Sequence, residues 1–307
     1  MKYFIYIIVT FIFIPFFIAT FFIHDTQPNE ESIILESNRQ IRVKREEKNV
    51  IETINLEDYI VGVIAGEMPI HFEMEALKAQ AVAARSYALK RMEYNSDKNH
   101  DIVDTVLNQV YLDDEHLKKS WENSYEENML KVRTAVLSTK GEYIEYNGKI
   151  ADALYFSTSN GFTENSEEIF GFEVPYLRSV ESIWDAEVSP VFNETKKYNI
   201  KDFYEKLELK YKENITINII KKSSTGRILN LKINNIEMTG SKLASKLKLR
   251  SNDFEINQNE KEIIIKTKGF GHGVGMSQYG AQGMAKQGYK YDEILKHYYK
   301  ETKISKI

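Results

Sequence analysis

The segment from Pro69 to Met92 constrains the fold most, because it predicts a helix that is apolar on almost every face. Alanine and aliphatic residues fill it, and such a helix is buried on most sides. Pro69 suits the first turn of a helix, and Glu73 and Glu75 in that turn complement the helix dipole. We therefore expect a central helix around which other parts of the chain pack closely.

Three of the basic residues in this segment are regularly spaced. His71, Lys78 and Arg85 recur every seven residues, which places them on nearly one stripe of the helix. In one interpretation the stripe is solvated and its alkyl stems cover the core. In the other it forms a cationic wall beside Glu67, the carboxylate that stands just before the predicted helix.

The composition of the whole chain excludes several classes of site. A chain of 307 residues can bury a core without covalent staples. The absence of cysteine excludes disulfides, thiolate zinc sites and cysteine nucleophiles. The 41 basic and 45 acidic residues give a net charge of −4, without the clustered basic face of a nucleic-acid-binding protein. Neither a dinucleotide fingerprint nor a P-loop is present, so we expect no cofactor and no metal.

The N-terminus carries an uncharged run from Tyr3 to Ile23. Its length suits a helix across roughly 30 Å of hydrocarbon. The run ends in TFFIHD, without the small-x-small site of a cleaved signal peptide, so an uncleaved anchor is favoured. Lys2 precedes the run and acidic residues follow it, which places the N-terminus in the cytoplasm. The sequence thus predicts a single-pass membrane protein whose C-terminal region is extracytoplasmic.

The predicted fold class is α+β: an N-terminal transmembrane helix, then a mixed helix/strand catalytic region with a smaller second subdomain. A strand is expected near Ile41–Val43, helices at Asn123–Thr139 and Ser241–Leu247, and a hairpin at Asn147-Gly148. The predicted boundaries divide the chain into an anchor (1–24), a polar stalk (25–48), a first catalytic part (49–189), a second subdomain or insertion (190–268) and a Gly-rich motif with C-terminal helices that completes the catalytic domain (269–307).

Glycines alternate with other residues at the start of the C-terminal region. In an extended strand, Gly269, Gly271, Gly273 and Gly275 would share one face, open to close approach by another backbone or a sugar. Ser277 follows them and can cap a short helix. No nucleophile-elbow motif surrounds any serine, which argues against a serine hydrolase.

Glu67 is the most specific candidate for chemistry. The apolar run before it and the buried helix after it would desolvate its carboxyl group and raise its pKa, whereas the helix dipole and the basic stripe would lower it. A carboxyl group that is protonated near neutrality can act as general acid on a glycosidic oxygen. Ordinary glycosidases need two carboxylates, and no convincing second one is found. In murein the muramic 6-hydroxyl can attack C1 instead, which gives a 1,6-anhydro product and needs one acid/base residue.

Several ordered motifs resemble one family. GVIAGEMPIHFEMEALKAQAVAARSYAL, YFSTSNGFT with VPYLRSVES, LKLRSNDFEI, and GFGHGVGMSQYGAQGMAKQGYKYDEILKHYY are similar to the stage II sporulation protein D family, which includes amidase enhancers. The resemblance extends from about Val50 to Ile307. It implies a membrane-anchored peptidoglycan lytic transglycosylase that remodels septal peptidoglycan during engulfment, with the stage II sporulation proteins P, an amidase, and M as partners. A non-catalytic, glycan-binding amidase enhancer is the alternative.

The resemblance also implies roles for individual residues. The family's catalytic glutamate falls on Glu67, and its important helix lysine and arginine fall on Lys78 and Arg85, which favours the cationic wall. The remaining residues that we expect to bind substrate lie in the hydroxyl cluster and in the Gly-rich motif: Ser157, Thr158, Ser159, His272, Ser277, Gln278 and Tyr279.

One stretch departs from the family pattern. Members often carry a Cys…His-Cys cluster, a zinc site in some, before a Q-V-Y sequence. Here Val103, Leu107 and Asn108 stand at those positions, so a thiolate zinc site cannot form. We expect Val103 and Leu107 to replace it by apolar packing.

Overall fold

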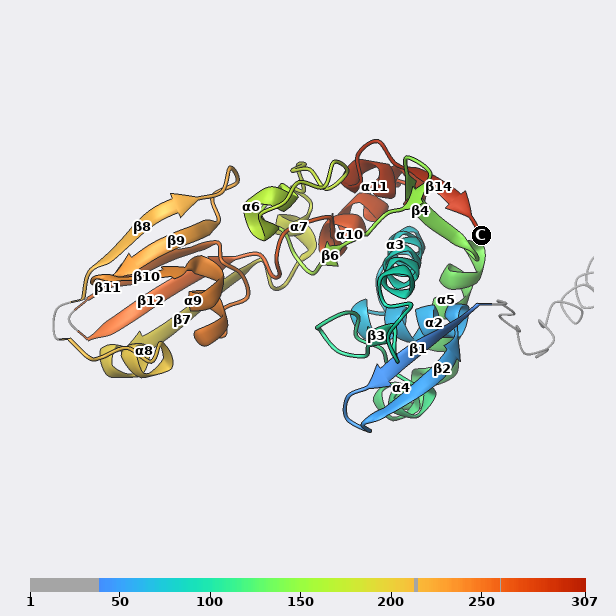
Figure 1. Cartoon of the computed structure of the whole chain (residues 1–307), viewed down its shortest axis with the longest axis horizontal. Coiled ribbons are helices and arrows are strands. Elements are labelled where there is room, and N and C mark those ends of the chain that lie inside the picture. Colours follow the sequence, from blue (N-terminus) through green and yellow to red (C-terminus); the bar gives the residue numbers. More distant parts are fainter. Residues whose placement is uncertain (1–38, 213–214, 260) are drawn as a thin grey trace, which may run out of the picture. The chain divides into compact units, whose positions relative to one another are not determined.

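The computed structural model describes residues 39–212, 215–259 and 261–307 (Figure 1). The predicted anchor at 1–24 and most of the predicted stalk lie outside these residues. In the part described, no helix is both long and apolar enough to span a bilayer. Helices and strands are mixed throughout, which confirms that part of the predicted fold class. The strand expected near Ile41–Val43 is present as β1, Gln40–Arg45.

Helix α3, Met74–Tyr94, is the central helix that the apolar segment predicts, and Figure 1 shows it surrounded by other elements. Alanines such as Ala79 and Ala83 are fully buried, and α3 packs against α2, α5, α10, α11 and β4. It begins at Met74 rather than Pro69. Residues 69–73 form the connection from the preceding helix, and Glu73 occupies the N-cap position.

The elements of this region fall into a helical group and three small sheets. The helices are α2 (Leu56–Glu67), α4 (Asp114–Trp121), the 3-10 helix η1 (Glu122–Ser124), α5 (Tyr125–Ser138), α6 (Ser166–Phe170), α7 (Asp185–Val188), α10 (Gln278–Lys286) and α11 (Tyr291–Tyr298). The sheets are β2–β1–β3 (Val50–Asn55, Gln40–Arg45, Ile102–Val103), β14–β4–β5 (Lys303–Lys306, Glu142–Tyr146, Lys149–Ile150) and the parallel pair β13–β6 (Met276–Ser277, Tyr155–Phe156). The predicted turn at Asn147-Gly148 joins β4 to β5, with positive φ at both residues.

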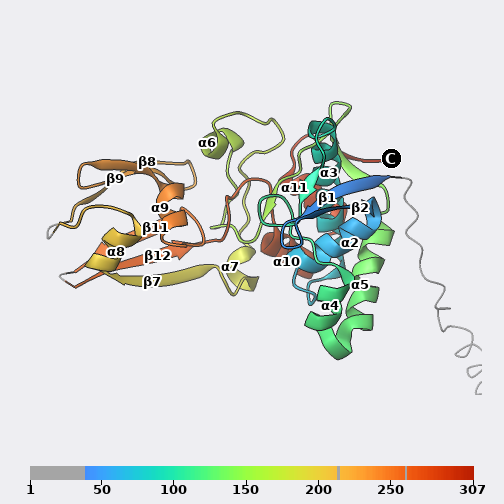
Figure 2. The ribbon, with the colours of Figure 1, turned by 60° about the horizontal axis from the view of Figure 1, so that its bottom comes forward.

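Residues 193–268 form two further three-stranded sheets with two helices, which both ribbon views draw together (Figures 1 and 2). The elements are β7 (Asn193–Asn199), α8 (Ile200–Lys206), β8 (Ile217–Lys222), β9 (Ile228–Ile233), β10 (Ile236–Thr239), α9 (Gly240–Lys246), β11 (Phe254–Gln258) and β12 (Glu262–Lys268). A hydrophobic cluster drawn only from residues 203–265 fills the space between them. This segment therefore carries a core of its own.

The Gly-rich motif is not the extended strand that we expected. Gly269, Gly271, Gly273 and Gly275 all have positive φ, between 74° and 106°, which favours glycine. A side chain at Gly275 would lie 2.0 Å from the backbone oxygen of Leu154. Gly275 thus permits close approach by another part of the backbone, one of the two expected partners.

Candidate active site

Glu67 is the last residue of helix α2, at its C-terminal end. The sequence placed it at the start of the following helix, but the apolar run before it is itself helical and the next helix begins only at Met74. This position reverses the expected effect of the helix dipole, because the C-terminus of a helix carries partial negative charge and disfavours a carboxylate.

Two hydrogen bonds hold the Glu67 carboxyl group. The backbone N–H of Val110 donates to Oε1 at 2.7 Å, and the side-chain amide of Gln278, the first residue of α10, donates to Oε2 at 3.4 Å. Burial raises the pKa of Glu67 above its usual range, whereas these two bonds lower it, and the net direction is upward. The carboxyl group is therefore suited to carry a proton at a higher pH than an ordinary glutamate.

Two glycines on α2 let the segment that carries Val110 lie against the helix. Gly62 and Gly66 are one turn apart, and a side chain at Gly62 would lie 2.3 Å from the Tyr111 ring. At Gly66 it would lie 2.9 Å from the backbone oxygen of Val110. The spacing of these glycines in a buried helix is a sequence signal for such an approach, and our sequence analysis did not use it.

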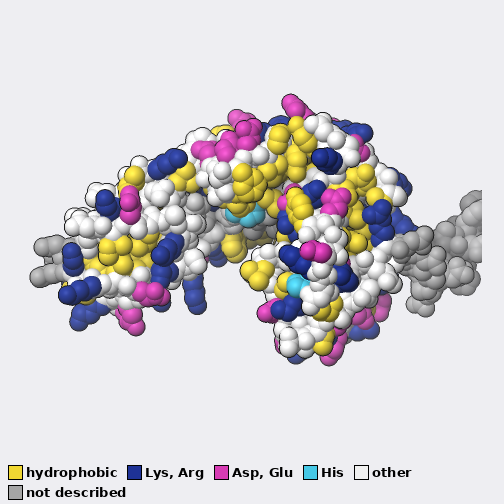
Figure 3. All heavy atoms as spheres, viewed as in Figure 1, with side chains coloured by type: hydrophobic (Ala, Val, Ile, Leu, Met, Phe, Trp, Pro, Cys, Tyr) yellow, Lys and Arg dark blue, Asp and Glu magenta, His cyan; other side chains and the backbone are white. Residues whose placement is uncertain are grey.

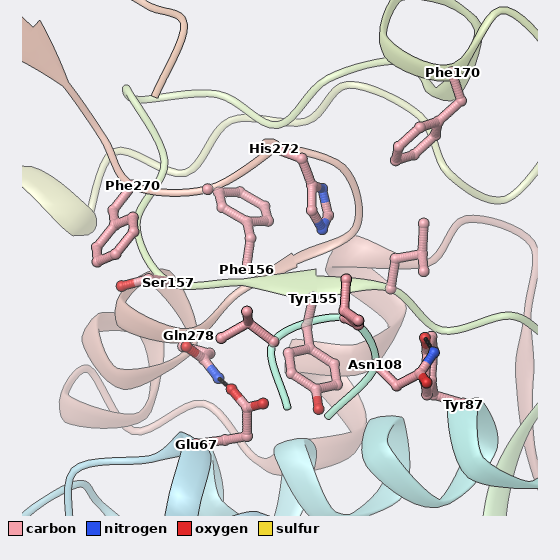
Figure 4. Close-up of a pocket in the computed structure, with 14 residues that line it drawn as sticks. Glu67, Tyr87, Asn108, Tyr155, Phe156, Ser157, Phe170, Phe270, His272 and Gln278 are labelled. Carbon is pink, nitrogen blue, oxygen red and sulfur yellow. Dashed lines mark hydrogen bonds between the residues drawn. The ribbon is translucent and has the colours of Figure 1, made fainter. Parts of the chain in front are cut away.

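Glu67 lines a pocket of about 420 Å³ whose other walls are largely aromatic (Figure 4). The lining residues are Glu67, Tyr87, Val106, Leu107, Asn108, Leu154, Tyr155, Phe156, Ser157, Phe170, Phe270, Gly271, His272 and Gln278. Among the described residues, Glu67 is the only carboxyl group in this lining. On the face drawn in Figure 3, hydrophobic side chains gather next to a histidine.

A buried amide connects the pocket residue Tyr155 to Tyr59 behind the wall. Gln109 donates to the hydroxyl of Tyr155 at 2.9 Å and accepts from that of Tyr59 at 3.1 Å. Burial and the neighbouring Glu67 raise the pKa of Tyr155, so its phenol stays neutral. The neighbouring Asn108 donates to the hydroxyl of Tyr87 at 3.0 Å. The sequence analysis missed these tyrosines, because no spacing along the chain relates them to Glu67.

His272 lies in the pocket wall, where Figure 4 shows it beside Phe156 and across from Glu67. Its ring centroid is 5.6 Å from that of Phe156 and 5.8 Å from that of Phe170. Its Nδ1 accepts a hydrogen bond from the backbone N–H of Val274 at 3.0 Å. Burial and the nearby Arg227 charge lower the pKa of His272 to about 4. His272 is therefore a neutral part of the wall near pH 7.

The predicted hydroxyl cluster is divided by the fold. Ser157 lines the pocket, whereas Thr158 and Ser159 are fully buried. Ser159 and Ser277 both bond to Asp185, a buried carboxylate that the sequence did not single out: the Ser159 N–H donates to Oδ1 at 2.9 Å and the Ser277 hydroxyl at 2.5 Å. This network fixes the segment that follows β6, which carries Ser157, against the start of α10.

The residues at the start of α10 have separate tasks. Ser277 is the predicted N-cap, and its hydroxyl accepts from the N–H of Gly280. Gln278 reaches Glu67, as described above. Tyr279 is outside the pocket lining and packs edge-on against Phe72, with 5.0 Å between ring centroids.

The structure does not bring Lys78 and Arg85 to Glu67. Lys78 forms an ion pair with Glu75 at 2.9 Å, and neither residue lines the pocket. Arg85 is fully buried and forms a two-pronged ion pair with Glu57, with Nε–Oε1 and Nη2–Oε2 distances of 3.0 and 2.6 Å. His71 precedes α3, so the three residues do not share a helical stripe. The expected cationic wall beside Glu67 is absent from the described residues.

The stretch that departs from the family pattern also differs from our expectation. Leu107 is 77% exposed rather than packed. Asn108 organises the turn instead, because its Oδ1 accepts from the backbone N–H of Val103 at 2.9 Å. In the described part of the chain, no group of three or more His, Asp or Glu side chains is arranged to hold a metal ion.

Comparison with known proteins identifies the family. Residues 44–146 match the SpoIID family, described as "Stage II sporulation protein". Stage II sporulation protein D of Bacillus amyloliquefaciens is 42% identical over 280 residues, which cover 90% of this chain and 81% of that protein. The protein of the same name from Bacillus subtilis (strain 168) is 43% identical over 270 residues, covering 86% and 78%. The chain belongs to the stage II sporulation protein D family.

A more distant relative bears a different name. The amidase enhancer of Bacillus subtilis (strain 168) is 29% identical over 298 residues, which cover 80% of this chain and 40% of that protein. The match to the SpoIID family includes α2, Glu67, α3 and the 104–113 segment, so the residues around the Glu67 carboxyl group lie largely within the region that defines the family.

Proposed function

We propose that this chain is a peptidoglycan lytic transglycosylase in which Glu67 is the single general acid and base. One observation carries the proposal: Glu67 is the only carboxyl group among the described residues that line an aromatic pocket, and burial raises its pKa. A hydrolase of the two-carboxylate type would need a second acid across the scissile bond. A reaction in which the substrate supplies its own nucleophile needs only one.

The reaction balances with this one residue. Protonated Glu67 gives its proton to the glycosidic oxygen as the bond from muramic C1 to that oxygen breaks, which frees the glucosamine 4-hydroxyl. Ionised Glu67 then takes the proton of the muramic 6-hydroxyl as O6 bonds to C1. The product ends in 1,6-anhydro-muramic acid, no water is consumed, and Glu67 is protonated again.

The pocket walls support a sugar substrate. Phe156, Phe170 and Phe270 offer apolar faces against which sugar rings can stack, and the Ser157 hydroxyl and the Gln278 amide can bond to hydroxyl groups. Val110 and Gln278 stabilise the Glu67 carboxylate after it has given up its proton.

We further propose the cellular setting that the relatives' names suggest. As a stage II sporulation protein, the chain would remodel septal peptidoglycan during sporulation and engulfment. The uncharged run Tyr3–Ile23 would anchor it to the membrane, with the C-terminal region outside the cytoplasm. The stage II sporulation proteins P and M are the partners that the family resemblance suggests.

The test is product analysis with the purified 307-residue chain on peptide-stripped glycan strands. Mass spectrometry should detect 1,6-anhydro ends with the wild type and none with Glu67→Gln, which keeps the shape of the side chain but cannot transfer the proton. General acid–base catalysis is typically worth about 10²–10⁴-fold in rate. Glu67→Gln should keep the wild-type melting temperature and glycan affinity.

Two results would reject the proposal. Anhydro ends released at the wild-type rate by Glu67→Gln would remove Glu67 from the chemistry. A wild type that binds glycan and stimulates an amidase, yet never releases anhydro ends, would instead favour the amidase-enhancer function suggested by the 29%-identical relative.

A further inference from the structure

A single arginine on strand β1 bonds to both ends of the segment 104–113. The guanidinium of Arg45 donates from Nε to Asp104 Oδ2 at 2.8 Å and from Nη2 to Asp113 Oδ2 at 2.9 Å. Its third nitrogen donates to Glu52 Oε2 on strand β2 at 2.7 Å. The Arg45 side chain is only 4% exposed. The two ends of the segment are therefore bridged by one planar cation.

The segment closed by this bridge supplies one wall of the Glu67 pocket. Val110 donates its backbone N–H to Glu67 Oε1, and residues 106–108 line the pocket. The Tyr111 ring lies 4.9 Å from the Arg45 guanidinium on one side and against Gly62 on the other. Contacts are thus continuous from Arg45 to Glu67, although the two side chains are not in contact.

We propose that Arg45 is a positioning residue of the active site, which clamps both ends of the 104–113 segment and so holds the Val110 N–H on Glu67. Its effect on turnover rests on the proposed function of Glu67. The planar guanidinium suits this task, because it presents several N–H donors in a fixed fork, whereas a lysine ammonium acts as a point charge.

Among the described residues, Arg45 is the side chain that bonds to both Asp104 and Asp113. Backbone bonds also hold the segment: the Glu46 N–H donates to Asp104 Oδ1 at 2.9 Å, and the Leu112 N–H donates to the backbone oxygen of Gly62 at 3.2 Å. Lys48 also reaches Asp113, at 2.9 Å, but its side chain is 41% exposed. His116 bonds to the other oxygen of Asp113, and neither Lys48 nor His116 has a recorded contact with Asp104. Without the guanidinium, three carboxylates would face one another at the base of the segment, and like charges at this distance repel.

The experiment compares Arg45→Lys with Arg42→Lys in the full 307-residue chain. Arg42 is a matched control on the same strand: it bonds to Asp101 and to the backbone oxygens of Lys98 and Asn95, outside the 104–113 segment. In Arg45→Lys we expect the amides of 105–112 to exchange with deuterium about tenfold faster or more. Anhydro-product turnover should fall by about 10–100-fold, since a misplacement of about 1 Å can cost about 10²-fold. Arg42→Lys should leave both unchanged.

The pH profile separates positioning from general stability. The limb of the rate profile that reports Glu67 should move to higher pH in Arg45→Lys, because the carboxyl group loses the Val110 donor that lowers its pKa, and should stay in place in Arg42→Lys. Equal exchange at 105–112 in the two variants, or an unmoved limb with wild-type turnover, would overturn the clamp. If the wild type releases no anhydro ends, the proposed function fails, but the exchange rates still decide whether Arg45 holds the segment.

Discussion

The buried pair of Arg85 and Glu57 allows a test of why the arginine is needed. Arg85 donates twice to Glu57 and once to the backbone oxygen of Glu142 at 2.9 Å, and the Arg85 and Glu57 side chains are 0% and 1% exposed. The pair joins α2, which ends in Glu67, to the central helix α3. We predict that Arg85 acts by holding these helices together rather than by touching substrate.

The expected magnitude follows from this geometry. Arg85→Met leaves the Glu57 carboxylate buried without a countercharge, and breaking such a pair costs about 3–5 kcal/mol. At about 2–4 °C per kcal/mol, the melting temperature should fall by roughly 6–20 °C. The double variant Arg85→Met/Glu57→Gln buries no charge. In the wild type the N–H of Gly141 donates to Glu57 Oε1 at 3.1 Å, and the side-chain oxygen of the glutamine in the variant can still accept this bond. We expect it to regain about 1–3 kcal/mol relative to Arg85→Met.

The assay combines thermal and urea unfolding of the wild type, both single variants and the double variant with product analysis below the melting temperature of the weakest. Activity should follow folding, so the double variant should regain most of the turnover. A stability loss under about 1 kcal/mol in Arg85→Met would refute the structural role. A double variant that is stable but inactive would instead favour a direct role of Arg85 in activity, as the family resemblance implies.

Three further outcomes are expected. Burial raises the pKa of Glu67, and the proposed reaction begins from the protonated form. Turnover should therefore be independent of pH at low pH and fall tenfold per pH unit above that pKa. A rate profile with its midpoint below about pH 4 would contradict this. Lys78→Ala removes the pair with Glu75 and a cation–π contact with Tyr291 at 6.0 Å, both away from the pocket, so turnover should stay within about twofold and stability within about 0.5 kcal/mol; a tenfold loss of turnover would place Lys78 at the substrate. Gly66→Ala should cut turnover about tenfold or more by displacing Val110, despite a gain in helix propensity of up to about 1 kcal/mol; wild-type turnover would show that the close approach is dispensable.

Local patterns predicted the elements well where one physical rule dominates. The all-apolar segment became the buried helix α3, Asn147-Gly148 became a hairpin turn, and Ser277 became an N-cap. Each of these depends on neighbours in sequence. The start of α3 was wrong because Pro69 suits a first helical turn, whereas in the structure residues 69–73 form the connection and α3 begins at Met74.

The features that could not be predicted from the sequence depend on contacts between residues far apart along the chain. Arg85 was expected on a solvated stripe or in a cationic wall beside Glu67, because nothing in the sequence pairs it with Glu57 on another helix. The Val110 amide is a backbone group and leaves no trace in a residue pattern, and Asp185 gathers Ser159 and Ser277 from distant segments. The pocket around Glu67 is assembled from contacts of this kind. Glu67 and the lining residues Ser157, His272 and Gln278 could be singled out from the sequence, whereas the hydrogen bonds around Glu67 and the lining tyrosines could not.

A single acid/base residue places a stricter demand on its surroundings than a pair does. In two-carboxylate enzymes one group can be tuned to hold a proton and the other to lose it. In the proposed reaction Glu67 first gives a proton and then takes one. Burial and the C-terminal end of α2 favour its neutral form, and the donors Val110 and Gln278 favour its ionised form. Additional hydrogen-bond donors would lower the pKa of Glu67 further and disfavour the protonated form that gives the proton. With fewer donors, the carboxylate would be less stabilised after the proton has been transferred. These opposing influences come from α2, the 104–113 segment and α10, so the pKa that the reaction requires exists only when all three are in place.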